Sequence, residues 1–241
     1  MGFTPSPPPL HHYITPSTIT TSPHHYISMT PCLGILISGR GSNLQSIVAA
    51  TRDGRLEATV GVVISNRAEA AGLQRAREAG LEARWMDPRD YSTRSAYDRA
   101  IVEVLGHFDV DLVCLAGFMR VIGGAILEAF PHRVLNVHPS LLPAFPGLDA
   151  QRQALEYGAR VTGATVHVVT PELDNGPIIL QASVPVLDDD TVETLSARVL
   201  SEEHRIYPEA IGLVLNGGWS IVGRRFLRPV GPSVVRERPS G

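Results

Sequence analysis

The fold is decided by the stretch Cys32-Leu33-Gly34-Ile35-Leu36-Ile37-Ser38-Gly39-Arg40-Gly41-Ser42-Asn43 of this 241-residue chain. Its first half, Cys32 to Ile37, is an apolar run typical of a buried strand. Its second half holds two glycines among polar residues and leads into the helical pattern of Asn43 to Thr51. A buried strand, a tight polar turn and a helix in this order predict the beginning of a parallel α/β sheet.

The same alternation continues downstream of this stretch. Further strands are expected at 58–64, 81–86, 111–116, 133–138, 162–169 and 177–184. Helices are expected at 70–79, at 92–106 with Ser92 as N-cap, from about 148 to Gly158, and from about Thr191. We therefore predict a single Rossmann-like α/β domain over residues 32–224, with a mostly parallel central sheet and helices on both faces.

Both ends of the chain differ from this predicted domain. Residues 1–31 are dense in proline, threonine, serine and histidine, without a period of 2 or 3.6, and residues 225–241 have a similar character. Such segments bury too little apolar surface to order themselves, so disordered tails are expected. No arginine precedes Met29, which argues against a transit peptide, and a sufficient apolar core for a secretory signal is also missing.

The composition disfavours several classes of protein. A formal net charge of −3 gives no reason to expect nucleic acid or an acidic membrane as a partner. No apolar run approaches the roughly 20 residues that span a bilayer. The two cysteines, Cys32 and Cys114, lie in apolar runs and are interpreted as buried residues, so neither a disulfide nor a metal site is expected. These features predict a cytoplasmic protein without a metal.

Polar clusters follow the strands at the edge where open parallel sheets bind ligands. In Ser38 to Asn43, two glycines and the start of a helix form an anion site suited to a phosphate. The loop lacks the third glycine of a dinucleotide fingerprint and the Gly-Lys of a Walker loop. It therefore favours a small phosphate ester, and a purely structural turn remains the alternative.

A second cluster is Asn136-Val137-His138-Pro139-Ser140-Leu141-Leu142-Pro143. Asn136 and His138 are two positions apart at a strand end, so both side chains project from one face. An amide and an imidazole together can stabilise an oxyanion and move a proton, although a histidine merely bonded at a strand end is the alternative. A third cluster, Glu172 to Pro177, has ordinary turn composition. It gains a chemical role if Asp174 reaches His138, because a carboxylate favours the charged imidazole.

Four motifs taken together closely resemble the phosphoribosylglycinamide formyltransferases, the folate-dependent family of purine synthesis. They are ISGRGSNLQ (37–45), LAGFMR (115–120), NVHPSLLP (136–143) and LDNGP (173–177). The resemblance runs from about Cys32 to Val222 and continues in Glu203 to Pro208 of the last helix. It implies an enzyme that transfers a formyl group from 10-formyltetrahydrofolate to the amine of glycinamide ribonucleotide in de novo purine biosynthesis.

The resemblance also implies roles for individual residues. Gly41, Ser42 and Asn43 would hold the acceptor phosphate. Glu203 would contact the glycinamide part of the acceptor. Catalysis would depend on Asn136 and charged His138, which stabilise the oxyanion, and on Asp174, which keeps His138 charged and helps proton transfer through water. The residues implied for folate binding are Arg94, Met119, Arg120, Val121, Ile122 and Asn136.

The chain departs from the family pattern at Asp149 and Gln151, where many relatives carry histidine. We interpret Asp149 as a helix cap. Two other functions stay open: a hydrolase of formyltetrahydrofolate, which would carry an amino-terminal regulatory domain, and a non-catalytic ligand-binding module. A methionyl-tRNA formyltransferase is disfavoured because it needs a further RNA-binding domain and a basic surface. The expected partners are two small molecules, and a homodimer is an open possibility.

Overall fold

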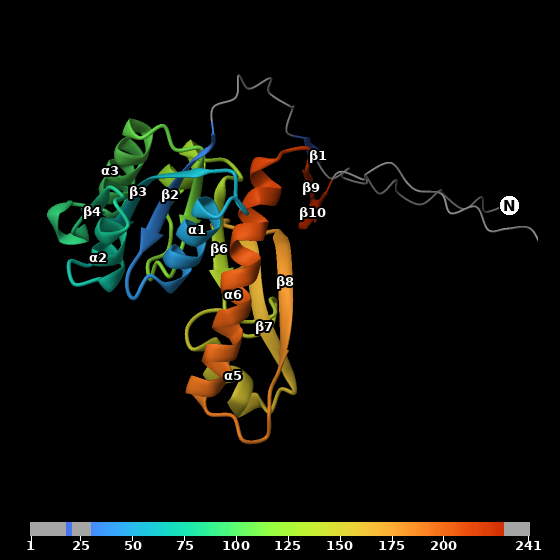
Figure 1. Cartoon of the computed structure of the whole chain (residues 1–241). Helices are drawn as coiled ribbons and strands as arrows, with labels where there is room; N and C mark the ends of the chain where they lie inside the picture. The colour runs from blue at the N-terminus through green and yellow to red at the C-terminus, as the bar shows by residue number, and fades with distance from the viewer. Residues whose placement is uncertain (1–17, 21–29, 229–241) are drawn as a thin grey trace, which may run out of the picture.

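The computed structural model describes residues 18–20 and 30–228, and a single sheet runs through them (Figure 1). Its strands are β1 (Thr18–Thr20), β2 (Cys32–Ile37), β3 (Thr59–Ser65), β4 (Ala83–Trp85), β5 (Leu112–Leu115), β6 (Val134–His138), β7 (Val161–Val168), β8 (Ile178–Pro185), β9 (Ser220–Val222) and β10 (Arg225–Leu227). The helices are α1 (Ser42–Arg52), α2 (Ala71–Glu78), the 3-10 turn η1 (Pro88–Asp90), α3 (Arg94–His107), α4 (Gly124–Ala129), α5 (Ala150–Tyr157) and α6 (Val192–Leu215).

The strand order is β1-β9-β10-β8-β7-β6-β5-β2-β3-β4. Strands β6, β5, β2, β3 and β4 pair in parallel, whereas β7 is antiparallel to both β6 and β8. The carboxyl ends of β2, β5 and β6 therefore meet at one edge. This edge collects the polar residues that follow each of these strands in the sequence.

Alternate residues of the parallel strands enter two different cores. Leu33, Ile35 and Ile37 of β2 pack in the core that contains residues of α1, α2 and α6, whereas Leu36 belongs to the core that contains residues of α3 and α4. Because successive strand residues point to opposite faces, helices must cover both sides of the sheet. The predicted α/β fold with a mostly parallel sheet is confirmed.

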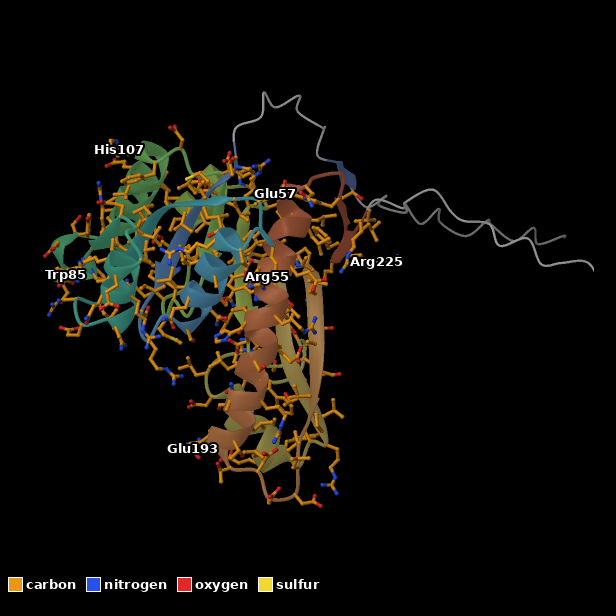
Figure 2. All side chains as sticks on the ribbon, viewed as in Figure 1. Arg55, Glu57, Trp85, His107, Glu193 and Arg225 are labelled. Carbon is orange, nitrogen blue, oxygen red and sulfur yellow. The ribbon has the colours of Figure 1, made fainter. Side chains whose placement is uncertain are left out.

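Helix α6 packs along β7 and β8, on the antiparallel part of the sheet (Figure 1). Figure 2 shows Glu193 at the start of this helix and Arg225 on β10, which pairs with β8. In the middle of α6, the buried Tyr207 hydroxyl lies 3.1 Å from the Leu115 carbonyl oxygen and 3.0 Å from that of Leu135. This phenol ties α6 to the end of β5 and to the start of β6.

We expect Tyr207→Phe to lower the free energy of unfolding by about 1–2 kcal/mol, because the two buried carbonyl oxygens lose the one hydroxyl hydrogen that they share. Urea denaturation followed by circular dichroism measures the change. Tyr157→Phe is the matched control, since Tyr157 is 82% exposed and keeps its ring in either form. Equal midpoints for the two variants would show that the buried hydroxyl contributes nothing to stability.

The predicted elements from Cys32 to the start of α6 lie within two residues of their observed bounds, but three local predictions were wrong. Thr18–Thr20, placed in the amino-terminal tail, pairs with β9 as β1, because a β-branched segment meets a free strand edge. Arg225–Leu227, placed in the other tail, pairs with β8 and β9. Thr93 rather than Ser92 caps α3, since its hydroxyl accepts from the Ala96 N–H at 3.1 Å.

The remaining tail predictions, for residues 1–17, 21–29 and 229–241, lie outside the described residues. Among the residues that the structure describes, no helix has the length and apolar character needed to cross a membrane.

Candidate active site

The loop after β2 has the geometry of an anion site. Gly41 adopts a left-handed backbone with φ of 74°, and a Cβ at this position would lie 2.7 Å from the Cα of Gly72. Glycine is therefore required here by both conformation and space. Ser42 and Asn43 open α1, whose first N–H groups have no partner within the helix. These N–H groups and the helix dipole favour an anion in front of the loop.

Asn43 also connects this loop to the last helix. Its side-chain Nδ2 donates to Glu203 Oε2 at 2.7 Å, and both side chains are buried. Burial raises the pKa of Glu203, while the Asn43 hydrogen bond and the charge of Arg40 lower it in part. The Asn43 Oδ1 is buried without a hydrogen-bond partner among the described residues. Glu203 of α6 and Asn43 of the loop thus place a carboxyl group and an amide oxygen side by side, both able to accept N–H or O–H groups of a ligand.

At the end of β6, the structure brings His138 and Asp174 together across 36 positions of sequence. His138 Nδ1 lies 3.4 Å from Asp174 Oδ2, and the two side chains are 6% and 8% exposed. The other ring nitrogen, Nε2, lies 2.9 Å from the Phe145 carbonyl oxygen. The His138 ring thus lies between a carboxylate and a carbonyl oxygen, two groups that can accept hydrogen bonds.

The turn that carries Asp174 has little freedom to move. Asp174 itself has a left-handed φ of 49°, a region in which aspartate is tolerated better than most residues. Its Oδ2 accepts from the Gly147 N–H at 2.8 Å. A Cβ at Gly176 would lie 1.7 Å from the Val168 carbonyl oxygen, so only glycine fits at this position. Arg224 of the β9–β10 turn donates to Asn175 Oδ1 on the outer side.

Beside the first turn of α3, three of the six residues expected to bind folate line a pocket of about 440 Å³: Arg94, Val121 and Ile122. The Arg94 guanidinium donates to the Val121 carbonyl oxygen at 2.6 Å. Buried Asp98 also lines the pocket, and burial raises its pKa against the opposing charges of Arg94 and Arg120.

The other three residues of the expected folate set lie outside the pocket lining. Met119 is 63% exposed, and its backbone N–H donates to Ser38 Oγ at 2.8 Å. This hydrogen bond joins the loop after β5 to the loop after β2. Arg120 lies over the ring of Tyr97, 5.3 Å from its centre. Asn136 lies in β6, in the cluster that contains His138.

Residues 33–211 match the family model described as formyl transferase. The chain belongs to the formyl transferase family. Every site residue from Gly41 to Glu203 falls within the matched range.

Relatives of this formyl transferase include phosphoribosylglycinamide formyltransferase of Escherichia coli, 46% identical over 183 residues, which cover 76% of this chain and 86% of that protein. The solved structure of glycinamide ribonucleotide transformylase 1 from Symbiobacterium toebii is 59% identical, with a TM-score of 0.82 and coverage of 83% and 95%. The trifunctional purine biosynthetic protein adenosine-3 of Bos taurus is 49% identical over 185 residues. That match covers 77% of this chain but 18% of the trifunctional protein, so the chain spans about a fifth of that relative.

The site of this formyl transferase contains a residue that the sequence patterns did not indicate, His167 of β7. It is 2% exposed, and its Nε2 lies 3.2 Å from Asn136 Nδ2 and 3.7 Å from Asp174 Oδ1. Burial is the largest influence on the pKa of His167 and lowers it. The only signal in the sequence was a polar residue inside an apolar strand. Its importance depends on the β6–β7 register, which sets His167 opposite Asn136.

Asp149, one of the two positions at which this formyl transferase departs from the expected family pattern, occupies the N-cap of α5 but makes no side-chain capping hydrogen bond. The residue has a left-handed φ of 55°, which turns the chain into the helix. The predicted position at the helix cap is confirmed, and the capping role is conformational, since aspartate tolerates this backbone region.

Proposed function

We propose that this formyl transferase moves the formyl group of 10-formyltetrahydrofolate to the amine of glycinamide ribonucleotide, in de novo purine biosynthesis. The observation that carries the proposal is the convergence of three features at one sheet edge. These are the glycine-rich anion loop at Gly41, the Asn136, His138 and Asp174 cluster, and the pocket beside Arg94. The similarity to formyltransferases with this named substrate supports the same assignment.

In the proposed reaction the acceptor amine attacks the formyl carbon. A C–N bond forms, and the carbonyl electron pair moves onto oxygen. An N–H of Asn136 and the charge of His138 stabilise this oxyanion. The attacking nitrogen loses a proton through water towards Asp174. Collapse of the intermediate breaks the bond to N10 of the folate, which takes up a proton, so the products are the formylated acceptor and tetrahydrofolate.

The contacts of His138 indicate how this residue would stabilise the oxyanion. Its two ring nitrogens face Asp174 and the Phe145 carbonyl oxygen. The ring therefore acts on the oxyanion chiefly as a fixed positive charge in a water-poor site, where Coulomb attraction is stronger than in water. Asn136 is the direct hydrogen-bond donor, because the Asn136 side chain keeps a second N–H beyond its contact with His167.

For the acceptor, we assign the phosphate to the N–H groups of Gly41, Ser42 and Asn43 and to the Ser42 hydroxyl. The Asn43 side chain is committed to Glu203 and acts by holding that carboxyl group in place. Glu203 would then accept from the glycinamide end.

Ser42→Ala is expected to weaken acceptor binding on the order of 10-fold, the scale of one hydrogen bond to a charged group. Folate binding should change less than about twofold, because no folate contact is assigned to the loop. Isothermal titration of each ligand separately measures both constants. Ser46→Ala is the control, since its hydroxyl bonds to the Asn43 carbonyl oxygen within the same helix. Equal losses for both ligands in Ser42→Ala would remove the phosphate assignment.

The decisive experiment is an absorbance assay for tetrahydrofolate formation, run with and without glycinamide ribonucleotide. We expect product only when the acceptor is present. Folate product without acceptor would identify a hydrolase instead. Binding of both ligands with no product in either arm would identify a non-catalytic module.

The proposal extends to the setting of the reaction: the cytoplasm, two small-molecule substrates, a monomer or homodimer, and no nucleic acid, membrane or metal. The mechanism assigns the stabilisation of charge to Asn136 and His138. We therefore expect the rate to be unchanged after dialysis against EDTA. A loss of rate that added zinc or magnesium restores would contradict the metal part of the proposal.

A further inference from the structure

His167 sits where three groups of the site converge. It lies on β7 directly opposite Asn136 of β6, and the register of the two strands fixes that pairing. Its Nδ1 lies 3.1 Å from the Val168 carbonyl oxygen, and its Nε2 lies 3.2 Å from the amide nitrogen of Asn136. Asp174 Oδ1 is slightly farther from Nε2, at 3.7 Å.

These contacts determine where the proton of His167 resides. A carbonyl oxygen can only accept, so Nδ1 must carry the hydrogen that points to Val168. Burial disfavours a second proton on the ring and lowers the pKa of His167. Nε2 is therefore a bare nitrogen with a lone pair. The group that faces a lone pair at hydrogen-bond distance must be a donor, which is the N–H of Asn136.

We propose that His167, neutral and protonated on Nδ1, is a positioning residue that fixes the rotation of the Asn136 amide. An asparagine amide can turn by half a rotation and exchange its oxygen for its NH₂ group at little steric cost. With the lone pair of His167 in place, one N–H is held and the second N–H stays available for the oxyanion. In the turned orientation the amide oxygen would face that negative charge and repel it.

Asp174 competes with His167 for the N–H of Asn136. Without the acceptor at Nε2, the released N–H of Asn136 would be drawn towards Asp174 Oδ1, which lies 3.7 Å from the position of Nε2 and so in a different direction. That pull would bias the amide away from the productive rotation. The inference rests on the proposed function, since it assigns Asn136 as the donor to the oxyanion.

The test compares two replacements of similar size. Gln places Oε1 near the position of His Nε2 and keeps an acceptor, whereas Leu removes it. We expect His167→Leu to lower the single-turnover formyl-transfer rate on the order of 10-fold, below the loss for a missing oxyanion donor. Both dissociation constants should stay within about threefold. His167→Gln should retain most of the rate. A rate for His167→Gln as low as that for His167→Leu would overturn the proposal.

A double-mutant cycle identifies the group through which His167 acts. In an Asn136→Ala background, His167→Leu should cost less than about twofold, because there is no amide left to orient. The same tenfold loss in that background would mean that His167 acts through Asp174 or through packing, and would overturn the inference. If His167→Leu does not fold, as judged by its melting transition, His167→Asn replaces it, since its shorter amide cannot reach the position of Nε2.

Failure of the proposed function would look different. In that case the parent chain would not convert glycinamide ribonucleotide at all. An active parent, a slow Asn136→Ala variant and a fully active His167→Leu variant would overturn only the role of His167.

Discussion

Asp174→Asn is expected to lower the single-turnover rate on the order of 10²-fold or more, the usual scale for an acid–base group. Acceptor and folate dissociation constants should change by less than about threefold, because the charge matters mostly where charge develops in the transition state. Rapid-quench measurement of one turnover, with separate titrations of each ligand, gives all three quantities.

The contacts of Asp174 explain why this substitution is a clean probe of charge. Its Oδ2 accepts from the Gly147 N–H and faces His138 Nδ1, whereas its Oδ1 faces the bare Nε2 of His167. An asparagine oxygen in the position of Oδ2 keeps the first two contacts. The asparagine NH₂ group then takes the place of Oδ1, beyond hydrogen-bond distance of His167 Nε2, which already accepts from Asn136. The hydrogen bonding survives, and only the negative charge that favours the charged His138 ring is removed.

The double substitution shows whether the two residues act as one unit. We expect His138→Asn combined with Asp174→Asn to be little slower than the slower single variant, as for other groups that work together. Rate losses that multiply fully would mean that His138 and Asp174 contribute independently. The proposed mechanism would then have to be abandoned.

Gly176→Ala is the second substitution with a large expected effect, a fall in turnover on the order of 10²-fold. A Cβ at this position would lie 1.7 Å from the Val168 carbonyl oxygen, which strand β7 holds in place. The turn must move instead, and Asp174 is only two residues away. A displacement near 1 Å in a catalytic group is enough for a loss of this size.

Gly106→Ala in α3 is the matched control, because a Cβ there meets nothing within 4 Å. Its turnover should equal that of the parent. Single-turnover rates and melting temperatures of both variants separate a moved turn from a general loss of stability. A folded Gly176→Ala variant with the parental rate would show that the turn tolerates displacement without loss of function.

Local sequence patterns predicted most of the parallel half of the sheet, because each of its strands, such as β2, is a nearly continuous apolar run. The anion loop was equally local, since its glycines and the helix start lie in six consecutive residues. Both features depend on short-range conformational preferences. The structure confirms the fold they predict, and Gly41 shows the steric reason for the loop sequence.

The rest of the site depends on contacts between distant segments. The proximity of His138 and Asp174 was expected only through the family resemblance, because an aspartate in a turn is ordinary. His167 was missed because an apolar strand does not reveal which residue of a neighbouring strand it faces. β1 and β10 were missed for a similar reason: their pairing depends on the free edges of other strands, which composition cannot show.

The hydrogen bond between Asn43 and Glu203 joins residues that are 160 positions apart. On a ribosome that adds about 5–20 residues per second, Asn43 is made roughly 8–30 s before Glu203. The proposed acceptor site therefore cannot be completed until nearly the whole domain has been synthesised. A nascent or truncated chain that lacks α6 retains the glycine loop but not the carboxyl group facing it. Under the proposed assignment, unfinished chains would offer the phosphate part of the acceptor site without the carboxyl group for the glycinamide end, and would compete poorly with completed chains for the acceptor.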